Sequence, residues 1–100
     1  MPNFKTKFGL LKLHSRHVFH IGVKHMGRHC KGSRFFEPYM ELIEETVKKG
    51  RLVRRQKNTY IVSLNFGRIV GITDIGRKCF AVYVIINYDS EIVSAYPNPK

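Results

Sequence analysis

The run Phe80–Tyr88 reads FAVYVIINY and constrains the fold more than any other part of the chain, because almost every position in it is apolar. A strand with one solvated face alternates apolar and polar residues, whereas an apolar run without alternation is typical of a buried strand. We therefore expect a strand at Cys79–Asn87 in the middle of a sheet, with helices packed across one side.

The residues from Thr59 onward are rich in β-branched and aromatic side chains, which are typical of strands. Turn-forming residues interrupt this half of the chain at Asn65–Gly67, Asp74–Gly76 and Asp89–Ser90. Because the connections are short, neighbouring strands should pair antiparallel. The expected strands are Tyr60–Leu64, Arg68–Thr73, Cys79–Asn87 and Glu91–Tyr96.

The first half of the chain is expected to be helical. Between Leu10 and about Met26, a mixed helix face is permitted by the three- and four-residue spacings of Leu10, Leu13, His17, His20 and Lys24. A second helix is expected at about Pro38–Lys49, with Gly50 as its stop. The fold class is then α+β, with N-terminal helices packed on a four-stranded antiparallel sheet, in one domain over residues 1–100.

The formal net charge of +11 stands out against ordinary shares of hydrophobic (43%) and charged (25%) residues, which indicate a chain that folds. The first 36 residues contain no Asp or Glu, but they hold eight Lys or Arg residues and all five histidines. Unbalanced positive charge repels itself in the folded state and is usually tolerated for the sake of a polyanionic partner. RNA, DNA or an acidic protein are the candidates.

No apolar run approaches the roughly 18 residues needed to cross a bilayer, and the N-terminal stretch lacks the features of a signal peptide. We therefore expect a soluble protein without an export signal of its own and without a membrane partner. Cys30 and Cys79 lie far apart in the sequence, so two buried thiols are favoured over a disulfide. One bridge remains the alternative in an oxidising compartment.

Two short patches carry a resemblance to a known toxin group. The first comprises His20, Ile21, His25 and Lys31, and the second comprises Ser94, Ala95, Tyr96 and Pro97. With the basic stretch, acidic helix and closing sheet between them, they resemble the C-terminal ribonuclease domains of bacterial polymorphic and contact-dependent growth inhibition toxins. These domains belong to the barnase, EndoU, colicin and RelE (BECR) group, and the likeness is to its EndoU-like members. The spacer before the second histidine is shorter here, so His25 and His29 are alternatives for that position.

The resemblance implies a BECR-like fold and a toxin domain carried at the end of a larger secreted protein. Such a domain acts in the cytoplasm of the target bacterial cell, and transfer RNA is the expected substrate. It also implies a cognate immunity protein. We expect that partner to be acidic, because opposite charges speed association.

Cleavage of RNA needs a base for the 2′-hydroxyl, an acid for the departing 5′-oxygen and a cation for the pentavalent phosphate. Histidine suits both proton steps near neutral pH. We expect His20 and either His25 or His29 to carry the protons and Lys31 to stabilise the phosphorane. Ser94 and Tyr96 would position the phosphate or the base from the last strand. The expected product is a 2′,3′-cyclic phosphate, formed without a metal ion or cofactor.

Further basic residues are expected to hold the RNA backbone by charge rather than to transfer protons. These nucleic-acid-binding candidates are Lys24, Arg28, Arg34, Arg51, Arg54 and Arg55. A solvated surface without any partner is the simpler explanation of the same charges.

Other functions remain as alternatives. A non-catalytic RNA- or DNA-binding module would use the same basic segment, with Phe35, Phe36 and Tyr39 stacking on bases. A ribosome-dependent cutter of messenger RNA that resembles RelE would differ in leaving free RNA intact.

A zinc site is the third alternative, because His25 and His29 are four residues apart with Cys30 adjacent. It is disfavoured because no nearby carboxylate or second cysteine completes the ligand shell.

Overall fold

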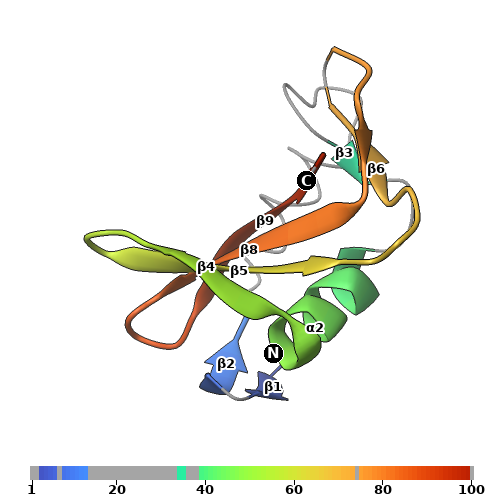
Figure 1. Ribbon diagram of the computed structural model, residues 1–100. Helices are drawn as coiled ribbons and strands as arrows, with labels where there is room; N and C mark the ends of the chain where they lie inside the picture. The colour runs from blue at the N-terminus through green and yellow to red at the C-terminus, as the bar shows by residue number, and fades with distance from the viewer. Residues whose placement is uncertain (1–2, 7, 14–33, 36–38, 74, 100) are drawn as a thin grey trace.

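The computed structural model describes residues 3–6, 8–13, 34–35, 39–73 and 75–99 (Figure 1). Within these residues one helix, α2 (Tyr39–Lys49), accompanies nine strands that form three antiparallel sheets. The largest sheet has the order β4-β5-β8-β9, from β4 (Arg51–Arg55), β5 (Thr59–Asn65), β8 (Ala81–Asn87) and β9 (Ile92–Asn98). The α+β class and the four-stranded antiparallel sheet are thus confirmed.

The apolar run of the sequence forms β8, which lies between β5 and β9, and the expected central position is confirmed. Helix α2 lies across one face of the sheet, against β5 and β8 (Figure 1). Alternate residues of β8 point to this side, and Val82, Val84 and Ile86 are all fully buried there. The strand thus supplies the centre of the core.

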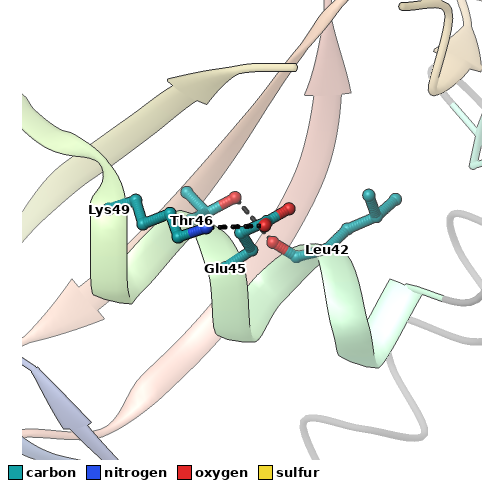
Figure 2. Close-up of polar contacts among 4 residues, drawn as sticks. All are labelled: Leu42, Glu45, Thr46 and Lys49. Atoms are coloured by element: carbon teal, nitrogen blue, oxygen red, sulfur yellow. Dashed lines mark hydrogen bonds and ion pairs between the residues drawn. The ribbon is translucent and has the colours of Figure 1, made fainter.

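Helix α2 buries one stripe and exposes a charged stripe. Leu42, Ile43 and Val47 enter the core, while Thr46 is buried and its Oγ1 donates a 2.7 Å hydrogen bond to the Leu42 carbonyl (Figure 2). On the exposed side, glutamates pair with lysines one turn later, and one such ion pair, Glu45 with Lys49, is drawn in Figure 2. The helix ends at Lys49, where glycine follows as expected from the sequence.

The expected N-terminal helix is wrong where the structure describes it. Instead of the start of a helix at Leu10, β1 (Asn3–Thr6) and β2 (Gly9–Lys12) form an antiparallel hairpin, whose turn places Gly9 at a φ of 96°. Leu11 and Leu13 are fully buried with Lys12 exposed between them, which is the two-residue period of a strand. The rest of the expected helix, residues 14–26, lies outside the described residues.

The strand expected at Arg68–Thr73 is also wrong as a member of the main sheet. Only β6 (Gly71–Ile72) forms there, and it joins β3 (Arg34–Phe35) and β7 (Lys78–Cys79) in a separate small sheet. The main sheet takes β4 as its fourth strand instead. Because β4 is an edge strand that is exposed throughout, it needs no apolar face, and its basic sequence gave no strand signal.

Two further expectations concern the cysteines and membrane-spanning helices. Cys79 is buried with a free thiol, whose pKa is raised by burial, whereas Cys30 lies outside the described residues. In the described part of the chain, no helix has the length and apolar character that crossing a membrane requires.

Candidate nucleic-acid interface

The side of the main sheet turned away from α2 carries the candidate site, and we call it the open face. Antiparallel partners share a face, so the strand register assigns its members. Two rows cross the sheet from β4 to β9. One row contains Arg51, Ser63, Tyr83 and Tyr96, and the other contains Arg54, Ile61, Ile85 and Ser94.

The open face joins residues that are far apart in the sequence. Ser94 and Tyr96 come from the last strand, and Arg51 and Arg54 come from the first strand of this sheet. All four were expected to contact RNA, in two separate groups. None of the residues in the two rows is acidic. The described glutamates of the helix lie on α2, which packs on the other face.

A β-bulge decides which arginine reaches the open face. The pairing of β4 with β5 shifts between Leu52 and Arg54, so Val53 is an extra residue and Arg54 pairs with Ile61. With regular alternation, Arg54 would point to the helix side. The bulge therefore places Arg54 on the same face as Arg51.

The open face is hollowed on both sides of Tyr83. One hollow of about 330 Å³ is lined by Val53, Arg54, Ile61, Tyr83, Tyr96 and Asn98. A second hollow of about 520 Å³ is lined by Lys49, Gly50, Arg51, Val53, Ser63, Leu64, Asn65 and Tyr83. Because Val53 and Tyr83 line both hollows, the two adjoin, and together they reach Arg51 and Arg54 of β4.

Tyr83 and Tyr96 form an aromatic pair on the β8–β9 side of this surface. Their ring centroids are 5.7 Å apart and the ring planes are inclined by 42°, and both residues are partly exposed. Burial raises the pKa of the Tyr96 phenol, Tyr83 raises it further, and the positive charge of Arg54 acts in the opposite direction. Tyr96 therefore stays protonated at neutral pH, and its hydroxyl is a hydrogen-bond donor rather than a base.

This combination suits a nucleic acid strand. Guanidinium groups bind phosphate through two parallel hydrogen bonds, and tyrosine rings stack on bases. Ser63 lies between Arg51 and Tyr83 in one row, and Ser94 ends the other row two residues before Tyr96 on the same strand, so both hydroxyls add hydrogen-bond donors and acceptors. The face thus combines groups that can bind phosphate with rings on which bases can stack.

The other expected site residues are not brought to the open face in the described structure. Arg55 belongs to β4 but pairs with Tyr60, and it points to the helix side. Arg34 begins β3, in the small sheet. Outside the described residues lie His20, His25, His29, Lys31, Lys24 and Arg28.

Sequence reasoning missed Tyr83 and Ser63. Tyr83 lies in the run that gave the central strand, where every neighbour is apolar and the pattern does not show which residues face solvent. The usable signal was its position opposite Tyr96, which depends on the register of β8 with β9.

The described residues hold no group of three His, Cys, Asp or Glu side chains that could bind a metal ion, and the zinc alternative rests on residues outside them. Comparisons with protein-family models, with curated proteins and with solved structures each find no match to this chain. Function is therefore inferred from geometry and charge.

Proposed function

We propose that this protein is a metal-independent endoribonuclease of the bacterial toxin type, which binds RNA on the open face and cleaves it by histidine acid–base chemistry. One observation carries the proposal. Ser94 and Tyr96 of the last strand lie with Arg51 and Arg54 of the first strand on a single face, in two rows that contain no acidic residue. A polyanion with stackable bases is the ligand that this combination favours.

The ends of the histidine segment support a cleavage role. Before that segment, the Lys12 amide donates a 2.8 Å hydrogen bond to the Ser90 carbonyl, and Lys12 pairs with Glu91 next to the start of β9. After the segment, β3 packs beside β9. The described residues that flank the segment, Lys12 and β3, thus both lie beside the strand that carries Ser94 and Tyr96, and this supports a common site.

On this proposal, His20 and either His25 or His29 exchange protons with the 2′-hydroxyl and the 5′-oxygen, and Lys31 stabilises the phosphorane. The Tyr96 hydroxyl donates a hydrogen bond to a phosphate oxygen. The 2′-oxygen attacks phosphorus as the 5′-oxygen departs, so the product carries a 2′,3′-cyclic phosphate and the reaction needs no metal.

The toxin proposal also concerns how the domain is delivered, which RNA it cuts and what neutralises it. We propose a BECR-like, EndoU-like domain that is delivered as part of a larger secreted protein and acts on transfer RNA in the target cell. An acidic immunity protein would neutralise it by covering the open face, where the arginines supply a matching charge.

A non-catalytic RNA-binding module is the second candidate. It is favoured by the content of the two described rows, which supply binding groups but no histidine or carboxylate. The two candidates bind RNA alike and differ only in whether they cut it.

The experiment compares cleavage of total bacterial RNA in EDTA by the parent protein, a His25→Ala plus His29→Ala variant, and Arg54→Gln. The control is Arg77→Gln, which removes the same charge from an exposed position near β7. We expect discrete fragments with cyclic phosphate ends from the parent and the control, none from the histidine variant, and fewer from Arg54→Gln.

Intact RNA in every lane, together with a shift of RNA mobility, would exclude cleavage and support the non-catalytic RNA-binding module. Equal cleavage of RNA that lacks the 2′-hydroxyl would exclude the proposed mechanism. Absence of both binding and cleavage would refute the RNA proposal itself.

A further inference from the structure

A second arginine–tyrosine group lies on the other side of the β4 edge. Tyr60 and Tyr88 have ring centroids 5.7 Å apart and planes inclined by 41°, almost the same geometry as the pair on the open face. Arg55 is the cross-strand partner of Tyr60. Neither the proposed cleavage chemistry nor the open face uses these three residues.

Tyr88 is held as a preformed platform. Its side chain is 53% exposed, yet its hydroxyl donates to the carbonyls of Gln56 at 3.3 Å and Thr59 at 3.5 Å. The Tyr60 ring supports it from one side. The ring centroid of Phe8 is 6.0 Å from that of Tyr60, so the aromatic cluster extends to the β1–β2 hairpin. The ring of Tyr88 is thus both exposed to solvent and held in place. Little side-chain conformational entropy is therefore lost when a base stacks on it.

The charge around this platform suits a phosphate. Arg55 ends β4 and Lys57 lies two residues later, and both are exposed. Asp89, which follows Tyr88 in the sequence, is one exposed carboxylate against these two cations. The charge of Arg55 also lowers the pKa of the Tyr60 phenol against the larger raising effect of burial, as expected for its cross-strand neighbour. An aromatic base and an anionic phosphate are accommodated side by side.

The β4 edge links this group to the open face. Arg54 and Arg55 are consecutive residues, but Arg54 pairs with Ile61 on the open face and Arg55 pairs with Tyr60 on the helix side. Because β4 is the edge strand and is exposed along its length, a strand of RNA that crosses the edge meets one guanidinium on each side.

We infer that Arg55, Tyr60 and Tyr88 form a second nucleotide-binding subsite, and that single-stranded RNA reaches it by passing over the β4 edge from the open face. The inference rests on the proposed RNA-binding function and adds the path and the strandedness of the substrate. An unpaired strand is required because both tyrosine pairs would stack on bases that a duplex keeps within its own stack.

The test measures fluorescence anisotropy of two labelled, 2′-O-methylated RNAs, which the proposed chemistry leaves uncut. One has about three nucleotides and the other about ten, within the usual site sizes of single-strand binders. The variants are Tyr88→Leu, Tyr88→Phe and Arg55→Gln, with Arg77→Gln as the control that loses the same charge elsewhere. Thermal unfolding of each variant shows whether the fold is kept.

We expect Tyr88→Leu and Arg55→Gln to bind the longer RNA about tenfold more weakly and the shorter RNA unchanged, because only the longer strand spans both groups. Tyr88→Phe keeps the ring and should bind like the parent. Arg55→Gln changes an exposed side chain, so it tests the subsite even if Tyr88→Leu unfolds.

Two results would overturn the inference in distinguishable ways. Unchanged binding of the longer RNA by Tyr88→Leu and Arg55→Gln, with weaker binding by Tyr83→Ala, would remove the second subsite and leave the open face as the RNA site. No binding of either RNA by the parent would remove the proposed function together with the inference.

Discussion

Replacement of Gly50 by alanine tests how the helix positions the arginine strand. Gly50 joins α2 to β4, and its amide donates a 2.7 Å hydrogen bond to the Thr46 carbonyl. A Cβ at this position would lie 2.4 Å from the Thr46 carbonyl oxygen and 2.6 Å from that of Ser63. Both atoms belong to the backbone, so relief requires the last turn of the helix to distort around Thr46 and the end of the helix to move away from Ser63 in β5.

The magnitude follows from these two contacts. Overpacking costs about 1–3 kcal/mol, and two backbone contacts place this substitution at the upper end, near 3 kcal/mol. Alanine also lowers the conformational entropy of the unfolded chain, which raises the free energy of unfolding by about 0.4–1 kcal/mol. We therefore expect Gly50→Ala to lower the free energy of unfolding by about 2 kcal/mol, and to weaken RNA binding because β4 begins at the next residue.

Urea denaturation of the parent and variant measures this difference, provided that the m-values agree. The control is Gly67→Ala, where the φ of 69° disfavours a side chain but the space around the Cβ is open. Its expected cost is about 1 kcal/mol, from conformation alone. A loss at Gly50 no larger than the loss at Gly67 would refute the steric argument.

Three other predictions concern the open face and the partly buried tyrosines Tyr60 and Tyr96. Arg51→Gln should reduce the slope of log affinity against log salt by about 0.7, the share of one phosphate contact on a single strand. Deletion of Val53 removes the extra residue of the bulge and leaves Arg54 opposite its present partner, so RNA titrations should give an affinity close to that of the parent; a loss as large as that of Arg54→Gln would contradict the register. Burial raises the pKa of Tyr60 and Tyr96 in the folded state, so their contribution to stability is complete below the ordinary tyrosine pKa and is lost as the pH rises through the folded values. Denaturation at increasing alkaline pH should therefore show a falling free energy of unfolding, and Tyr96→Phe should make the fall smaller.

The sequence predicted the elements whose patterns are unambiguous. The apolar run fixed β8 as the central strand, and the periodicity and following glycine located α2 within a residue of its observed start. Ser94 and Tyr96 were correctly assigned to the last strand. In each case one local pattern admits a single interpretation, so no tertiary information was needed.

Other elements depend on partners that a local pattern does not contain. Leu10, Leu11 and Leu13 fit the spacing of a helix as well as that of a strand, and the choice follows from pairing with β1 around the Gly9 turn. The assignment of Arg54 to the open face and of Arg55 to the helix side depends on the bulge, which strict alternation along RLVRR does not reveal. Both failures lie in register, which is set between strands rather than within them.

An edge strand rich in arginine has a simpler explanation than RNA binding, because charge and a bulge on an edge prevent pairing with another chain. Both features are present in β4, so protection of the edge accounts for its charge and its irregular ladder. Protection alone, however, requires only that the charges be exposed, and it is indifferent to what lies beside them. Arg54 lines a hollow with Tyr83 and Tyr96, while Arg55 pairs across the strand with Tyr60. After the bulge, Arg54 faces the Tyr83–Tyr96 pair and Arg55, the next residue, pairs with Tyr60 on the other side. The two roles are therefore compatible, and RNA binding would account for the neighbouring tyrosines that protection leaves unexplained.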